Sequence, residues 1–176
     1  MLTQTQRAVL KGMAGGASIA VAVVLYGVLV NPWSHPEDLV VDRRLQVAVR
    51  ASMAPALLLA IAIVRLARHR FFSEADIEGG SPARGTGRAL FLQAMVQNTL
   101  EQALLACIAY TAWAMVMPPA WLSVVTLAAL SFVLGRVLFF MHYRRGAGAR
   151  ALGFTVTFYP TTVMLALCAL WAIAAP

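Results

Sequence analysis

The stretch Gln93-Ala-Met-Val-Gln-Asn-Thr-Leu-Glu-Gln102 places strongly polar side chains inside an apolar segment that runs from Ala89 to about Met117. At about 100° per residue, Gln93, Gln97 and Glu101 fall on one narrow stripe of a helix. The segment exceeds the roughly 20 residues that span a bilayer, and Glu101 lies near its middle. An ionisable group at that depth costs about 2.5–3.5 kcal/mol on insertion scales. We therefore expect Glu101 to face a partner or a water-filled cavity, which makes it the first candidate site residue.

The composition of the whole chain also indicates a membrane protein. Of the 176 residues, 61% are apolar and 12% are charged, and the mean hydropathy is +0.77. The net charge of +7 could suggest a nucleic-acid partner, but the basic residues flank apolar runs and do not gather on one soluble face. Charges in such positions mark topology and contact anionic lipids. We expect one integral membrane domain in contact with membrane lipid, and no nucleic-acid partner.

Apolar runs predict an all-α fold with five transmembrane helices, at residues 12–30, 45–64, 89–117, 121–141 and 151–175. The first run could be a signal peptide, but the following Asn31-Pro-Trp33 lacks the small residues of a cleavage site. A retained helix fits better. Gly12 and Gly16 have the small-xxx-small spacing that favours close helix packing. Residues 71–87 form the long polar linker, which we expect to be mobile.

The basic residues predict the orientation of the chain. Ten of them flank the N-terminus, the 71–87 linker and the 142–150 turn, whereas three flank the opposite side. Positive residues concentrate on the cytoplasmic side. We therefore expect the N-terminus in the cytoplasm and the C-terminus outside.

Arg136 is the cation that lies well inside the later runs, so we expect it to pair with Glu101. Phe140 and Tyr143 follow it on the same helical face. The pair has two interpretations: a buried ion pair that locks two helices, or a polar interior that leads to a basic mouth. That mouth would be formed by Tyr143, Arg144, Arg145 and Arg150, and it would suit an anionic ligand beside a lipid-soluble one.

The residues that commonly bind metals do not form a pattern here. The histidines (His35, His69 and His142) are scattered, and the cysteines (Cys107 and Cys168) lie inside apolar runs. Neither set has the spacing of a metal or redox site, so we expect packing cysteines and no metal.

Two blocks of this sequence resemble a known family. Asn98-Thr-Leu-Glu101 resembles the N-x-x-E signature of the MAPEG family, the membrane-associated proteins in eicosanoid and glutathione metabolism. Gly135-Arg-Val-Leu-Phe-Phe-Met-His-Tyr143, followed by Arg150-Ala-Leu-Gly-Phe154, resembles that family's second conserved block. The resemblance covers roughly residues 45–175, and it is to a divergent, bacterial-type member, which implies a bacterial inner membrane.

The resemblance implies a four-helix domain over residues 45–176, assembled as a homotrimer, with residues 1–44 adding a transmembrane helix and a connector. It also implies a glutathione transferase or peroxidase with glutathione as co-substrate. Arg150 would stabilise the glutathione thiolate, which attacks a lipophilic small molecule; a nearby guanidinium lowers a thiol pKa from about 8.5. Further glutathione contacts would come from Asn98, Glu101, Arg136, Tyr143 and Arg145. One of the arginines Arg65, Arg68 and Arg70 would match the basic end of the family's first helix, and we take Arg68 as that contact.

Three positions depart from the family pattern. Ala94 replaces an Arg, Phe139 replaces a common Tyr, and Gln102 stands where some members have Tyr. Each change removes a donor, and charge-assisted contacts are worth about 1.5–3 kcal/mol each. An alternative is therefore a lipid-binding or scaffold protein that keeps the fold without catalysis. A small transporter is a weaker third possibility, because no internal repeat or pair of broken helices is visible.

Overall fold

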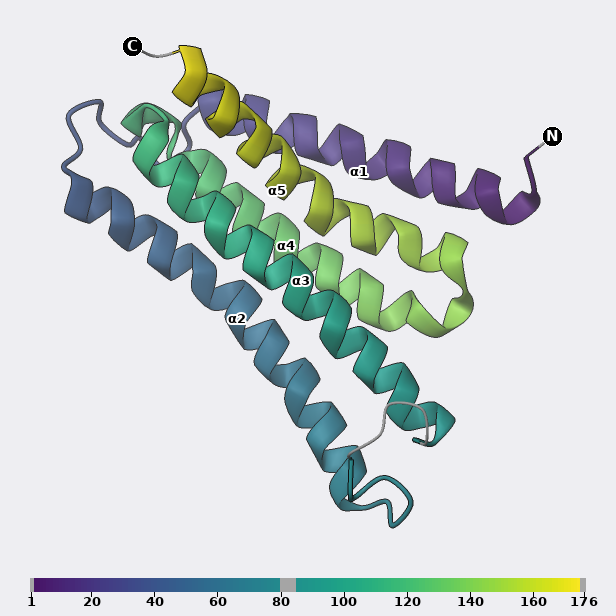
Figure 1. The fold of residues 1–176 in the computed structure, drawn as a ribbon. Helices are drawn as coiled ribbons and strands as arrows, with labels where there is room; N and C mark the ends of the chain where they lie inside the picture. The colour runs from purple at the N-terminus through teal and green to yellow at the C-terminus, as the bar shows by residue number, and fades with distance from the viewer. Residues whose placement is uncertain (1, 80–84, 175–176) are drawn as a thin grey trace.

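The computed structural model describes residues 2–79 and 85–174, and these form five long helices (Figure 1). No strand occurs in these two ranges, and each long helix has the length and apolarity of a membrane span. The predicted all-helical integral membrane fold is confirmed. The helices are α1 (Gln4–Leu29), α2 (Val41–Phe71), α3 (Gly87–Val116), α4 (Ser123–His142) and α5 (Ala147–Ala174).

The helices pack as a bundle in which α2 lies along α3, and α4 and α5 lie together beside them (Figure 1). The helix α1 packs along α5 and begins at the end of the bundle where α5 also begins (Figure 1). The large side chains of Tyr110, Trp113, Phe132 and Met164 are fully buried between the helices. The centre of the core is therefore made by α3, α4 and α5.

Glycines bring α1 into close contact with α5. A Cβ atom on Gly12 would lie 2.8 Å from the Cβ of Ala151, and one on Gly16 would overlap Thr155. The Thr155 hydroxyl donates a hydrogen bond to the carbonyl oxygen of Gly12 at 2.8 Å. The close packing predicted from the spacing of Gly12 and Gly16 is confirmed, and its partner is the N-terminal half of α5.

Several helices extend beyond the apolar runs that predicted them. The basic residues 65–70 belong to the last turns of α2, and Arg150 belongs to the first turns of α5 and not to the predicted 142–150 turn. Tyr143–Arg145 form a short 3₁₀ helix between α4 and α5. Arginine is a good helix former, so helices continue past the hydrocarbon into water. Apolar runs mark only the membrane-embedded part.

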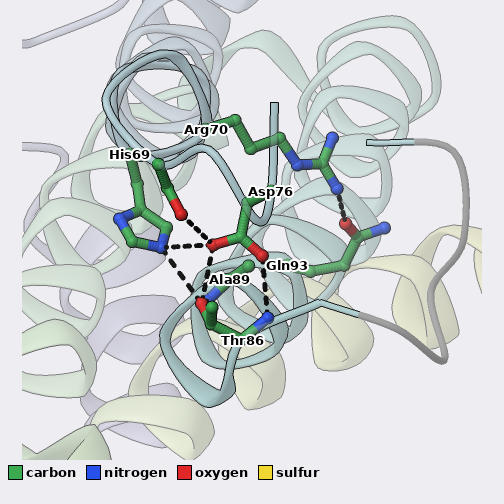
Figure 2. Close-up of polar contacts among 7 residues, drawn as sticks. His69, Arg70, Asp76, Thr86, Ala89 and Gln93 are labelled. Carbon is green, nitrogen blue, oxygen red and sulfur yellow. Dashed lines mark hydrogen bonds and ion pairs between the residues drawn. The ribbon is translucent and has the colours of Figure 1, made fainter. Parts of the chain in front are cut away.

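Asp76 holds together the two described ends of the 71–87 linker (Figure 2). Its buried carboxylate accepts hydrogen bonds from the Thr86 backbone N–H and hydroxyl, both at 2.7 Å, and from the Ser73 hydroxyl at 2.8 Å. His69 Nε2 lies 3.1 Å from the same carboxylate. The linker expected to be mobile is thus fastened at Asp76 and Thr86, while residues 80–84 of that prediction lie outside the described ranges.

Candidate functional site

Arg136 is completely buried and connects three helices. Its Nη1 donates to Asn98 Oδ1 on α3, and its Nη2 donates to Thr157 Oγ1 on α5, each at 2.8 Å. Its Cζ lies 4.4 Å from the centroid of the Phe139 ring. Two charge-assisted hydrogen bonds and an aromatic face stabilise the buried cation without a carboxylate.

The predicted ion pair between Arg136 and Glu101 is wrong within this chain. The Glu101 carboxylate is exposed and accepts a 2.9 Å hydrogen bond from Gln97 Nε2, while the ion pair found in the described part of the chain joins His69 and Asp76. Asn98 lies about 100° further round α3 than Gln97 and therefore reaches α4 instead. The stripe formed by Gln93, Gln97 and Glu101 faces outward from the bundle.

A groove of about 430 Å³ brings together three of the predicted site residues. Asn98, Tyr143 and Arg150 all line it, and they come from α3, the short 3₁₀ helix and α5. The Cζ of Arg150 lies 4.7 Å from the centroid of the Tyr143 ring, so the guanidinium is stacked on the phenol. The volume falls in the range of about 300–1,000 Å³ that is typical of small-molecule sites.

The groove is charged at one end and apolar along its length. Phe154 and Phe158 follow Arg150 at four-residue intervals on α5 and also line the groove, with their rings stacked at 5.4 Å. Eight residues of helix extend about 12 Å, so the apolar part runs well beyond the guanidinium. Val9 and Met13 of α1 also line the groove. The arrangement suits a ligand with an anionic head and an apolar body.

Arg136 also orients one donor in this groove. A guanidinium only donates hydrogen bonds, so its contact must be with the Asn98 amide oxygen. The Asn98 Nδ2 group is then the part of the amide that can donate to a ligand in the groove. Arg136 is in this sense a positioning residue for Asn98.

Four predicted site residues do not line the groove, and one of them, Arg136, is buried behind Asn98. Glu101 and Arg145 are exposed, and neither lines it. Arg68 lines a separate pocket near the ends of α2 and α4. Among the described residues, no group of three or more His, Cys, Asp or Glu side chains is placed to hold a metal ion.

Two groups of functional residues were missed from the sequence. Val9 and Met13 line the groove from α1, and Thr157 holds Arg136 from α5. The Gly12 and Gly16 spacing on either side of Met13 signalled a close helix contact. It contained no information on which helix would be contacted, and therefore none on the groove.

The chain was compared with known proteins. No curated protein and no solved structure matches it. A family comparison does match: residues 47–170 fit the sequence model of the MAPEG family, and they include α3, α4 and all but the last turn of α5. The chain belongs to the MAPEG family of membrane proteins, whose functions lie in eicosanoid and glutathione metabolism.

Proposed function

We propose that this protein is a membrane-bound transferase or peroxidase that uses glutathione to conjugate or reduce lipophilic electrophiles. The observation that carries the proposal is the convergence of Asn98, Tyr143 and Arg150 on one groove with an apolar extension. Glutathione is an anionic tripeptide, and its lipophilic reaction partner would come from the membrane. The charged end of the groove suits the anionic tripeptide, and its apolar part suits the lipophilic partner.

Arg150, Asn98 and Tyr143 each have a role in this proposal. The Arg150 guanidinium stabilises the thiolate over the thiol, which otherwise has a pKa of about 8.5. The Asn98 Nδ2 and the Tyr143 hydroxyl donate to carbonyl or carboxylate oxygens of the tripeptide. The thiolate sulfur then forms a bond to an electrophilic carbon, and the leaving group departs with its electron pair.

We also propose that the site is completed in a homotrimer. Glu101 is exposed near the middle of α3, where hydrocarbon would otherwise surround its carboxylate. A neighbouring subunit that covers the stripe of Gln93, Gln97 and Glu101 removes this cost. Glu101, Arg145 and Arg68 would contact glutathione only through such packing. Native mass spectrometry of the detergent-solubilised protein tests this, because a monomeric mass would contradict it.

Glutathione-dependent conjugation of an aryl halide by purified protein tests the activity. We expect Arg150→Ala to lower kcat/KM by about 10-fold to 100-fold, since it removes a charge-assisted contact worth about 1.5–3 kcal/mol. Arg43→Ala is the matched control, because Arg43 is an exposed arginine at the start of α2. Equal activity of the two variants, or no activity of the unaltered protein, would argue against the enzyme.

One observation favours a second candidate, a lipid-binding protein of the same fold without catalysis. Phe139 lines the groove, and as a phenylalanine it offers no hydroxyl to a ligand. Thermal unfolding in millimolar glutathione separates the two functions. A ligand at about 100 times its Kd adds about 2.7 kcal/mol of stability. No shift with glutathione, together with a shift with a fatty acid, would favour the lipid-binding function.

A further inference from the structure

A second pocket, of about 930 Å³, opens near the linker, where α2 and α4 end and α3 begins. It shares none of its lining residues with the glutathione groove. Four arginines line it from separate elements: Arg65 and Arg68 from α2, Arg88 from α3, and Arg144 from the short 3₁₀ helix. Of these lining residues, the glutathione site proposed above uses Arg68.

The charge of this pocket is not balanced by the described residues that line it. Within residues 2–79 and 85–174, no Asp or Glu is among its lining residues. The carboxylate next to it, Asp76, is already occupied by Thr86, Ser73 and His69 (Figure 2). Nearby Arg70 turns away and donates to Gln93 Oε1 at 2.6 Å (Figure 2). Guanidinium groups held together in this way repel one another, and an anion between them would relieve the repulsion.

The walls of the pocket hold its donors in place. The Cζ of Arg144 lies 4.7 Å from the centroid of the Phe91 ring, and that of Arg65 lies 6.0 Å from the Phe140 ring. A guanidinium stacked on an aromatic ring keeps its N–H groups free for an oxyanion. Ser73 and His69, also in the wall, are fixed by Asp76. Phosphate is an oxyanion that accepts such forked contacts.

Exposed apolar side chains beside the arginines identify the ligand as an amphiphile. Phe72 and Met141 line the pocket, although 77% and 67% of their surfaces are exposed. A free phosphate would leave these side chains uncovered, whereas an acyl chain would cover them. The pocket also lies at helix ends, at the level of lipid headgroups. We propose that it binds the phosphate headgroup of an anionic phospholipid.

Thermal unfolding of the purified protein in neutral detergent tests the lipid site. The probes are short-chain phosphatidylglycerol, short-chain phosphatidylcholine, inorganic phosphate and glutathione. We expect phosphatidylglycerol to raise the unfolding midpoint saturably. Phosphatidylcholine, whose choline balances the phosphate charge, and inorganic phosphate at the same concentration should not.

The double variant Arg88→Gln with Arg144→Gln should weaken phosphatidylglycerol binding by about 10-fold or more. The double variant Arg43→Gln with Arg50→Gln, on the opposite half of α2, should bind as the unaltered protein does. All four arginines are exposed, so both variants should fold. Native mass spectrometry, which counts retained lipids, gives a second readout on the unaltered protein.

Four results would overturn the proposal. Equal shifts with both lipids would show that charge is not recognised, and an equal shift with inorganic phosphate would indicate a free-phosphate site. Full binding by the Arg88 and Arg144 double variant would place the lipid elsewhere. Displacement of phosphatidylglycerol by glutathione would assign the pocket to the glutathione site. If the unaltered protein does not conjugate an aryl halide but does bind phosphatidylglycerol, the proposed enzyme activity is contradicted and the lipid site is not.

Discussion

Arg136 shows how one buried cation can serve both stability and the site. Its two hydrogen bonds, to Asn98 and Thr157, tie α4 to α3 and α5. Removing one acceptor leaves the guanidinium buried without that partner, which costs more than removing the whole charged group. The structural role and the positioning role are therefore separable by the choice of variant.

We expect Thr157→Val to destabilise the protein by about 1.5–3 kcal/mol, because the Arg136 guanidinium loses its acceptor on α5. Thr162→Val is the matched control, since the Thr162 hydroxyl bonds only to carbonyls of its own helix. Arg136→Met should be less destabilising than Thr157→Val but should weaken glutathione binding, because Asn98 is no longer oriented. Denaturation in mixed micelles and glutathione titration measure the two effects. Equal stability of the Thr157 and Thr162 variants would contradict the argument.

Asp76 makes the stability of the linker depend on pH. Hydrogen bonds from the Thr86 hydroxyl and backbone lower the pKa of Asp76 from its ordinary 3.8 to about 2. A carboxyl whose pKa is lower in the folded state stabilises the fold above its unfolded pKa and loses this contribution as pH falls through the folded pKa. The unfolding midpoint should thus fall between about pH 4 and pH 2. Asp76→Asn should flatten this fall, whereas Glu74→Gln, at an exposed position, should keep it.

Part of the site could be predicted from single residues, and part could not. Asn98, Tyr143 and Arg150, chosen by their resemblance to family motifs, do meet at one groove. The pairing of Glu101 with Arg136 failed because helical periodicity defines a polar stripe without saying which way it faces. Asn98, at the edge of the same stripe, is the residue that reaches Arg136. A single sequence has the same pattern of residues for a surface that another subunit covers and for a surface that is buried within the chain.

At the scale of elements, the N-terminal helix α1 supplies part of the lining of the groove. The helix contributes Val9 and Met13 to the lining of the groove, together with Phe154 and Phe158 of α5. The apolar run at residues 12–30 predicts this helix. The helix begins earlier than the run, at Gln4, where Thr3 caps it. Its partner could not be predicted, because any helix with small residues four apart accepts a Gly12 and Gly16 surface. In the structure Ala151 and Thr155 provide that spacing.

The contact between α1 and α5 should be sensitive to a single methyl group. We expect Gly12→Ala to cost about 1–3 kcal/mol, because its Cβ would lie 2.8 Å from both the Ala151 Cβ and the Leu152 backbone nitrogen. The displaced start of α5 carries Arg150, so glutathione affinity should fall as well. Gly15→Ala is the control, since its Cβ would meet only the tip of the Leu152 side chain at 3.0 Å. Equal unfolding midpoints of the two variants would show that α1 and α5 can move apart to fit the added methyl group at little cost in stability.

Met13 should influence which lipophilic substrates are accepted. Met13→Trp places a larger side chain into the groove, so KM for long-chain electrophiles should rise about 10-fold, roughly 1.4 kcal/mol. KM for glutathione should stay unchanged, because the polar end of the groove is not altered. Leu10→Trp is the control, as Leu10 is exposed on α1 and does not line the groove. A parallel change for both substrates would indicate a general distortion of the site.

At the scale of the whole molecule, the arginine pocket and the groove lie toward the same end of the bundle. The residues that carry charge in them come from the end of α2, from the starts of α3 and α5, and from the short 3₁₀ helix between α4 and α5. Antiparallel helices joined in sequence bring these helix ends together (Figure 1). The excess of positive residues at this end is what predicts a cytoplasmic orientation. Both sites would then open toward the compartment that supplies glutathione.

We expect this orientation in a bacterial inner membrane, and fusions to the C-terminus test it. Five spans place the start of α1 and the end of α5 at opposite ends of the bundle (Figure 1). A cytoplasmic N-terminus therefore requires an external C-terminus. Alkaline phosphatase, which folds only outside the cytoplasm, should be active when fused there, and a fluorescent protein that folds only inside should be dark. The opposite pattern would turn the arginine pocket outward and separate both sites from cytoplasmic glutathione.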